Sequence, residues 1–160
     1  MRGILILLAA VSGAAAPVDK QLHVRVPMRD GVQLCTNVFH PGGVGRTPVI
    51  LIRTPYNKGT DISPNYRPFV DRGYTIVVQD VRGRFDSKGV FDPLYQETPD
   101  GEDTLKWLAA QPWSNGSVGM MGGSYLGIVQ WRLALANHPH LKAIFPTVSG
   151  IDDYLDRFYR

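Results

Sequence analysis

The stretch Val118-Gly-Met-Met-Gly-Gly-Ser-Tyr-Leu-Gly127 decides the predicted fold of this chain. Apolar residues lead into a glycine pair, a serine follows at Ser124, and an almost entirely apolar segment runs on to Asn137. This order predicts a strand, a sharp turn and a helix, which is the layout of a nucleophile elbow. The match to the pattern G-x-S-x-G is imperfect, because Leu126 stands where the second glycine belongs and Gly127 comes one position late.

Other interpretations of this stretch compete with the elbow. On the motif alone, an ordinary glycine-rich loop between a strand and a helix is equally consistent. A dinucleotide-binding fingerprint fails, because Ser124 takes the place of the second glycine in G-x-G-x-x-G. A phosphate-binding loop fails as well, because Ile128 stands where that motif needs lysine. The neighbouring elements must therefore decide between elbow and loop.

The composition is that of a globular protein. The chain has 160 residues, of which 44% are hydrophobic and 19% charged, so one domain with a substantial core is expected. The net charge of +3 is mild and the basic residues are scattered, which argues against a nucleic-acid partner. Cys35 is the only cysteine, so no disulfide forms within the chain, and zinc-type spacing is absent. No metal or organic cofactor is expected.

The first residues have the pattern of a secretory signal peptide. Arg2 supplies a positive start, residues 4–11 form an apolar run, and residues 13–16 are small. Cleavage within residues 14–16 is expected, which leaves residues 17–160 as the mature chain and places it in the periplasm or outside the cell. The apolar run is short for a membrane span, and an uncleaved anchor is the alternative interpretation.

Alternating residues predict an antiparallel hairpin at a sheet edge. The alternation runs from Leu22 to Met28, turns at Asp30-Gly31 and resumes from Val32 to Val38. In this arrangement Leu22 shares the inner face with the valines that follow it, and His23 and His40 are expected at the surface.

After the hairpin, apolar runs alternate with helical patterns. Strands buried on both faces are expected at residues 49–52, 74–78, 118–121 and 141–148. Three helices are expected: a short one over residues 67–72, one from Thr98 as capping residue to just before Pro112, and a buried one over residues 125–137.

This order implies an α/β protein with a mostly parallel sheet, opening like an α/β-hydrolase fold. The turn at Ser124 follows the fifth strand, where that fold carries its nucleophile, and this context favours the elbow over the loop.

The motifs and their order resemble the amino-terminal part of the cocaine-esterase and X-Pro dipeptidyl-peptidase group of serine hydrolases, also called CocE/NonD. Each matching piece is weak alone, but together they are specific, and they run in the family's order over about residues 22–155. The family also writes its elbow with the late glycine. The pieces are Met28-Arg-Asp-Gly-Val-Gln-Leu34, Arg53-Thr-Pro-Tyr-Asn-Lys58, Gln79-Asp-Val-Arg-Gly-Arg84 with Ser87-Lys-Gly89, Glu102-Asp-Thr-Leu105 with Trp107, Gln111-Pro-Trp113 with Asn115-Gly116, and the elbow with Gln130-Trp131.

The resemblance implies roles for two side chains. Ser124 matches the family's nucleophile, and Tyr56 matches the tyrosine whose hydroxyl helps hold the oxyanion, alongside the backbone N–H of Tyr125. Physical chemistry supports this assignment, because the positive end of a helix dipole stabilises a developing alkoxide or oxyanion at an elbow serine. The N–H of the residue after the nucleophile is an expected oxyanion donor in this fold.

The rest of a catalytic triad is expected outside this chain. In α/β hydrolases an acid and then a histidine follow the serine. His138 and His140 follow the elbow helix, whose roughly 20 Å length separates them from the serine. Asp152 and Asp153 follow the last predicted strand, but the family's acid comes later.

Three charged residues near the predicted site are expected to have structural roles. Asp80 ends a predicted strand and is interpreted as a loop anchor. Arg82 and Arg84 are interpreted as solvated or loop-locking charges.

The resemblance also implies that this chain is an amino-terminal piece, because the family continues with the rest of the sheet, a helical cap and a jelly-roll domain. The complete protein is expected to hydrolyse a small-molecule ester or a peptide or amide, and the 160 residues alone are expected to be inactive. An X-Pro dipeptidyl-peptidase or an acylase is the alternative activity. A catalytically inert, hydrolase-like binding module is the non-enzymatic alternative.

Overall fold

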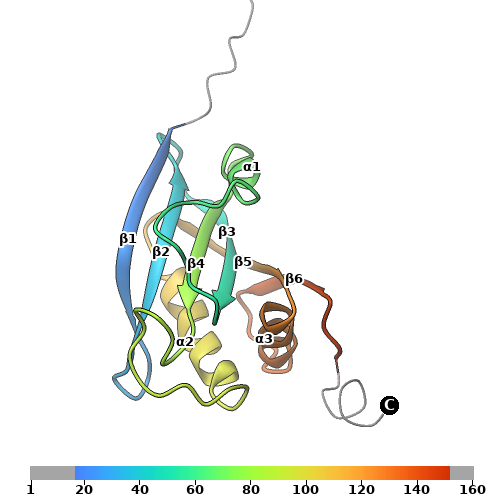
Figure 1. Cartoon of the computed structure of the whole chain (residues 1–160). Coiled ribbons are helices and arrows are strands. Elements are labelled where there is room, and N and C mark those ends of the chain that lie inside the picture. Colours follow the sequence, from blue (N-terminus) through green and yellow to red (C-terminus); the bar gives the residue numbers. More distant parts are fainter. Residues whose placement is uncertain (1–16, 152–160) are drawn as a thin grey trace, which may run out of the picture.

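The computed structural model describes residues 17–151 as a six-stranded sheet with helices packed on it (Figure 1). The predicted signal peptide lies outside the described residues, as do Asp152 and Asp153. Within residues 17–151 there is no helix long and apolar enough to cross a bilayer. The elements are β1 (Val18–Pro27), β2 (Gln33–Pro41), β3 (Thr47–Thr54), α1 (Arg67–Val70), β4 (Thr75–Asp80), α2 (Glu97–Ala109), β5 (Ser114–Gly123), α3 (Tyr125–Ala134) and β6 (Leu141–Thr147).

The strands lie in the order β1-β2-β4-β3-β5-β6. β1 pairs antiparallel with β2, and β2 antiparallel with β4, whereas β4, β3, β5 and β6 are parallel. The predicted hairpin and the predicted mostly parallel α/β sheet are therefore confirmed. The carboxyl ends of the parallel strands meet at one edge of the sheet, which is where sheets of this kind form ligand sites.

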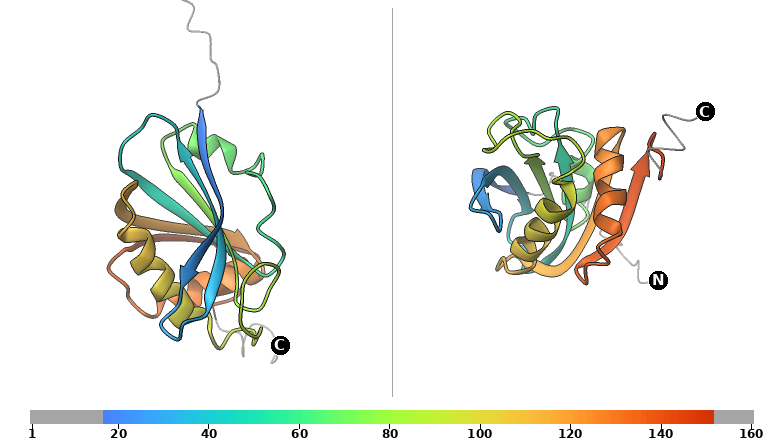
Figure 2. Two further views of the ribbon diagram at one scale, coloured as in Figure 1. Left: turned by 90° about the vertical axis from the view of Figure 1, so that its left-hand side faces the viewer. Right: turned by 90° about the horizontal axis from the view of Figure 1, so that it is seen from below.

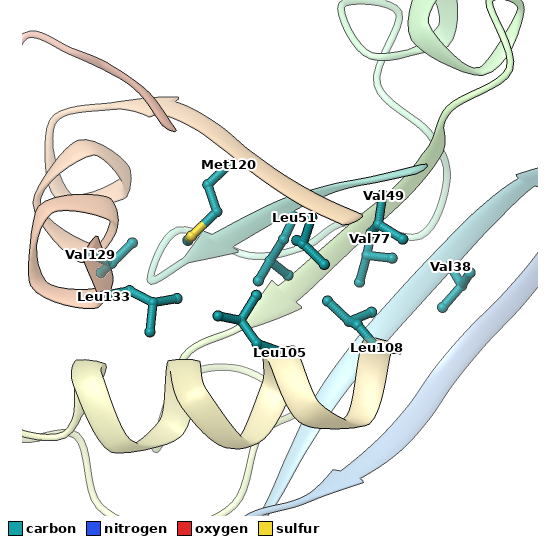
Figure 3. Packing of buried hydrophobic residues seen from close by; sticks show 10 residues of the cluster. Val38, Val49, Leu51, Val77, Leu105, Leu108, Met120, Val129 and Leu133 are labelled. Atoms are coloured by element: carbon teal, nitrogen blue, oxygen red, sulfur yellow. The ribbon is translucent and has the colours of Figure 1, made fainter. Parts of the chain in front are cut away.

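Successive residues of the central strands face two separate cores, which explains their continuous apolar sequence. Leu51 shares one core with Leu105 and Leu108 of α2 and with residues of α3 (Figure 3). Ile52 belongs to the other core, together with Val70 of α1. Figure 2 shows α2 and α3 side by side. Full burial of one leucine side chain stabilises a fold by roughly 1.5–3 kcal/mol, so these cores hold the helices firmly against the sheet.

The hairpin differs from its prediction at one point in β1. A β-bulge between Gln21 and Val24 adds one residue to β1, so Leu22 is 42% exposed and does not share the inner face with Val26. His23 lies within the bulge at φ 55° and is exposed, as predicted.

His40 is buried, although the alternation predicted a surface residue. Its Nδ1 lies 2.7 Å from the hydroxyl of Thr75, and its Nε2 lies 3.0 Å from the carbonyl oxygen of Val44. The reason is topological: β2 lies between β1 and β4, so only β1 is an edge strand of the hairpin.

β6 was predicted to be a buried strand, but it is mostly exposed or half-buried. Within residues 17–151 it pairs with β5 alone and forms the outer edge of the sheet, and Phe145 is 65% exposed. An apolar hollow of about 610 Å³ lies beside it, lined among others by Ile50, Met121 and Phe145. An apolar run leads to a buried strand only where neighbouring elements cover it.

The helices around the site differ slightly from their predicted ends. α2 begins at Glu97, and the hydroxyl of Thr98 does not cap it but donates to the carbonyl oxygen of Arg132 at 3.1 Å. α3 ends at Ala134 and buries one face instead of its whole surface.

Candidate active site

The predicted strand–turn–helix is present at Ser124. This residue connects β5 to α3 with φ 56° and ψ −125°, a conformation that costs an ordinary residue about 1–3 kcal/mol. Ser124 is exposed to solvent. A strained, exposed serine at the first turn of a helix has the backbone geometry of an elbow rather than that of an ordinary loop.

Two glycines make room for this bend. A Cβ atom at Gly122, which has φ 139°, would lie 2.6 Å from the Cβ of Leu126. A Cβ at Gly127 would lie 2.2 Å from the hydroxyl oxygen of Ser149. Leu126 therefore folds back over Gly122, and the late glycine lets the chain after β6 approach the helix closely. This packing explains the departure from G-x-S-x-G.

Tyr56 lies at the same edge of the sheet as Ser124. β3 and β5 are parallel neighbours with Leu51 paired to Met120, and Tyr56 and Ser124 follow the carboxyl ends of these two strands. Tyr56 is 60% exposed, and its hydroxyl has no hydrogen-bond partner among the described residues. The hydroxyl is therefore available to a ligand at this edge.

A cavity of about 440 Å³ lies beside these strand ends. Its wall is mostly apolar and combines the loop after β3, the loop after β4 and the start of α3. It is lined by Pro55, Tyr56, Arg84, Phe91, Pro93, Leu94 and Tyr125. Tyr56 and Tyr125 thus face one hollow, as expected for two contributors to one site.

Backbone strain gathers around this edge. Apart from Ser124, positive φ occurs in the loops that follow β3 and β4, at Asn57, Phe85 and Leu94, and after β6, at Val148, whereas His23 and Asn137 have it elsewhere. Such strain persists only where the surroundings hold it, and it is concentrated at functional sites.

The side chain of Tyr125 is tied to a buried ion pair. Its hydroxyl donates to Oε1 of Glu97 at 2.7 Å and accepts from the N–H of Leu94 at 3.3 Å. Burial, together with the neighbouring Glu97, raises the pKa of Tyr125 well above its ordinary value, so the phenol stays protonated. Arg53 lies 2.9 Å from the other carboxylate oxygen of Glu97 and donates to its carbonyl oxygen at 2.8 Å.

Glu97 and Arg53 were not among the site residues predicted from the sequence. The available signal was weak: Arg53 is a charged residue directly after an apolar strand run, and Glu97 stands at a helix start. Both are nearly fully buried, which is rare for charged residues unless they are paired.

The charged residues predicted to anchor loops do so. Asp80 accepts from the N–H of Lys58 at 2.7 Å and forms an ion pair with its ammonium at 3.3 Å. Arg82 binds Asp100 at 2.6 Å and Asp30 at 2.7 Å. These contacts fix the loops that form one wall of the site.

Arg84, interpreted in the same way, packs against the cavity wall. Its Nε donates to the carbonyl oxygen of Pro55 at 3.1 Å, and its guanidinium lies over the rings of Phe85 and Phe91. It therefore links the loop after β3 to the loop after β4.

One cluster of side chains has the atoms of a metal site. His23 Nδ1 lies 3.7 Å from Cys35 Sγ and 3.3 Å from a carboxylate oxygen of Asp86. The ammonium of Lys58 contacts the same oxygen, and its hydrogen bond lowers the pKa of Asp86. Burial raises the pKa of the Cys35 thiol. The lysine therefore already supplies the positive charge that a metal ion would bring.

The two histidines that follow the elbow in the sequence lie away from Ser124. His138 and His140 follow the carboxyl end of α3, whereas Ser124 precedes its amino end. His140 Nδ1 lies 2.8 Å from the carbonyl oxygen of Gly116, at the opposite end of β5 from Ser124. The structure thus places Ser124, Tyr56 and Tyr125 at one edge of the sheet, and it places these two histidines elsewhere.

Known proteins with similar sequences are named as esterases. A cocaine esterase from a Rhodococcus species is 44% identical over 142 residues, covering 86% of this chain and 25% of that protein. A putative serine esterase from Mycobacterium bovis is 32% identical over 155 residues, covering 82% of this chain and 25% of that protein. This chain therefore spans about a quarter of the length of these relatives.

Solved structures agree in fold. A CocE/NonD family hydrolase from Staphylococcus aureus has a TM-score of 0.73 at 34% identity, covering 79% of this chain and 27% of that chain. An α-amino acid ester hydrolase has a TM-score of 0.72 at 34% identity, covering 88% and 26% respectively. The resemblance drawn from the sequence motifs is therefore confirmed.

The sequence pattern of one protein family, described as X-Pro dipeptidyl-peptidase (S15 family), matches residues 30–160, which is most of the chain and includes the elbow. The chain belongs to the X-Pro dipeptidyl-peptidase S15 family.

Proposed function

We propose that the complete protein is a serine hydrolase that transfers the acyl group of an ester or amide to water, with Ser124 as the nucleophile. The observation that carries this proposal is the strained, exposed Ser124 between β5 and α3. In this conformation the hydroxyl stands at the amino end of a helix, where the helix dipole favours a developing negative charge.

The oxyanion of the tetrahedral intermediate is bound by two donors in this proposal. The N–H of Tyr125 is one of the first in α3, and such groups have no partner within the helix. The hydroxyl of Tyr56 is the second donor, since Tyr56 is an exposed residue lining the cavity that Tyr125 also lines. Donors fixed in place before reaction stabilise the intermediate without reorganisation.

The general base and its acid partner come, in this proposal, from parts of the protein beyond these 160 residues. The positions of His138 and His140 at the far end of α3 support this assignment, as does the greater length of the relatives. The base takes the Ser124 proton as the oxygen attacks and later returns it to the leaving group, and water then releases the acyl group.

The substrate class follows from the site and from the relatives. The mostly apolar wall of the 440 Å³ cavity suits the carbon skeleton of an acyl group. Similar proteins bear the names cocaine esterase and α-amino acid ester hydrolase, which favour a small ester. The family description favours the alternative, an X-Pro dipeptidyl-peptidase.

We also propose that the protein is exported and that the leader is removed within residues 14–16, on the strength of the leader pattern in residues 1–16. Mass spectrometry of the amino terminus of the mature protein tests this. An intact Met1 on the mature protein would contradict it.

The activity is tested on the complete protein with p-nitrophenyl acetate, an X-Pro-p-nitroanilide and a fluorophosphonate probe. Ser124→Ala is expected to abolish turnover and labelling, because removal of a serine nucleophile lowers kcat by about 10⁶-fold. Ser117→Ala, in the amino-terminal half of β5, is the matched control and is expected to change neither. Turnover that survives Ser124→Ala would refute the proposal, and a protein with neither turnover nor labelling would be the inert binding module.

The same assays on residues 17–160 alone are expected to show no Ser124-dependent turnover. The base is missing in this proposal, and a triad acts as a unit. Turnover by this piece that disappears with Ser124→Ala would show that the base lies within it.

A further inference from the structure

The residue after the proposed nucleophile is fixed by its side chain as well as by its backbone. Tyr125 begins α3, and its hydroxyl reaches Glu97 at the start of α2 at 2.7 Å. The N–H of Leu94, in the loop before α2, donates to the same hydroxyl at 3.3 Å. Two segments that are far apart in the sequence, residues 94–97 and the start of α3, are therefore joined directly behind the elbow.

The position of Glu97 is itself fixed, because a residue of the sheet binds it. Arg53 at the end of β3 contacts both its carboxylate and its carbonyl oxygen, and Nε of Arg53 donates to Gln79 of β4 at 3.0 Å. Gln79 also accepts from the hydroxyl of Thr104 in α2 at 3.1 Å. A chain of buried polar contacts thus runs from the central strands to the phenol of Tyr125.

This arrangement has a consequence for the geometry of the oxyanion hole. Ser124 is strained, so rotation of the peptide that joins it to Tyr125 would lower the backbone's energy. The peptide keeps its orientation only if neighbouring groups prevent this rotation. That peptide carries the N–H that is the proposed oxyanion donor. An oxyanion donor is effective only within a few tenths of an ångström of its required position.

We propose that Glu97, held by Arg53, is a positioning residue for the oxyanion hole, which it aims by fixing the side chain of Tyr125. The inference rests on the proposed function of Ser124 and Tyr125 and extends it to residues that do not touch the substrate. A purely structural tie would affect stability alone. A positioning tie affects the transition state more than the bound substrate.

The test compares three variants of the complete protein. Tyr125→Phe removes the hydroxyl and leaves the backbone N–H, and Glu97→Gln keeps an oxygen that accepts from Tyr125. Tyr74→Phe is the matched control, because this phenol lies at the opposite edge of the sheet, just before β4. Each variant is assayed with p-nitrophenyl acetate and with phenylboronic acid, whose serine adduct puts an anionic oxygen in the oxyanion hole.

Tyr125→Phe is expected to lower kcat about tenfold, as a small misplacement of a catalytic group does. KM is expected to stay within about twofold, and inhibition by phenylboronic acid to weaken by the same factor as kcat/KM. Glu97→Gln is expected to give a smaller loss of kcat, and Tyr74→Phe none.

The inference alone fails if Ser124-dependent turnover and phenylboronic acid inhibition are unchanged in Tyr125→Phe, or if that variant changes only the thermal midpoint. If wild-type turnover survives Ser124→Ala, the proposed function fails and this inference fails with it. If Glu97→Gln does not fold, Tyr125→Phe still decides the outcome.

Discussion

The amino-terminal half of α2 is held by similar ion pairs in contrasting surroundings. At the amino end, Arg53 and Glu97 form an ion pair whose side chains are 0% and 4% exposed. Further along, Arg29 from the β1–β2 turn binds Asp103 and Glu102, and the Arg29 side chain is 50% exposed. Arg82, 9% exposed, binds Asp100 between these two positions.

This contrast shows that burial, rather than the number of charges, decides what an ion pair does. Water replaces a lost partner at the surface, so exposed pairs contribute little to stability. No water replaces a lost partner inside, and a single buried charge left behind is strongly destabilising. The buried pair is also the one beside the elbow, where a fixed geometry serves the proposed chemistry.

The largest effect is expected from Arg53→Met. This change leaves the Glu97 carboxylate buried without its partner and is expected to lower the free energy of unfolding by about 3–5 kcal/mol. Urea denaturation of the complete protein measures it. Because removing both charges leaves none unpaired, the double variant Arg53→Met/Glu97→Gln is expected to recover part of the loss. A double variant less stable than Arg53→Met would break the comparison.

An intermediate effect is expected from Arg82→Met. Asp100 is as buried as Glu97, but the Arg82 guanidinium is 9% exposed and its second partner, Asp30, is 52% exposed. Water therefore reaches part of the gap that the variant leaves, and the loss of these charge-assisted hydrogen bonds is expected to cost about 2 kcal/mol. The same urea denaturation experiment is expected to place the stability loss of Arg82→Met between those of Arg53→Met and Arg29→Met. A loss as large as that of Arg53→Met would mean that burial does not set the order.

The smallest effect is expected from Arg29→Met, below about 1 kcal/mol at neutral pH. Burial alone raises the pKa of Asp103, but hydrogen bonds from Arg29 outweigh it and lower the pKa. A lowered folded pKa stabilises the fold above the unfolded pKa, near 4, and this contribution is lost as pH falls through the folded value. Thermal midpoints between about pH 2 and 6 are therefore expected to depend less on pH in the variant. An unchanged pH profile would contradict this assignment.

Most of the architecture followed from patterns in the sequence, because the central strands are continuous apolar runs and the hairpin has a clear turn at Asp30-Gly31. Whether a given side chain is buried or exposed was harder to predict. The burial of His40 depends on strand order, and the exposure of Phe145 depends on what lies beside β6. Neither quantity is a property of the local sequence.

The candidate site was predicted in part. The positions of Ser124, Tyr56 and Tyr125 at one edge follow from motifs and from the order of parallel strands, and their chemical roles remain predictions. The Arg53–Glu97 pair was beyond reach, because its members are 44 positions apart and alternation does not reveal a partner at that separation. The Lys58–Asp86 contact escaped for the same reason, at a separation of 28 positions.

The packing of Leu126 on Gly122, and of Ser149 on Gly127, shows which positions of this bend need a glycine. The turn at Ser124 requires empty volume on both sides, and Gly122 and Gly127 provide it from different places in the chain. The position of each glycine therefore follows from where the backbone must leave space for a neighbouring group. In this chain the space after the elbow is left at Gly127, where Ser149 packs, and not at residue 126.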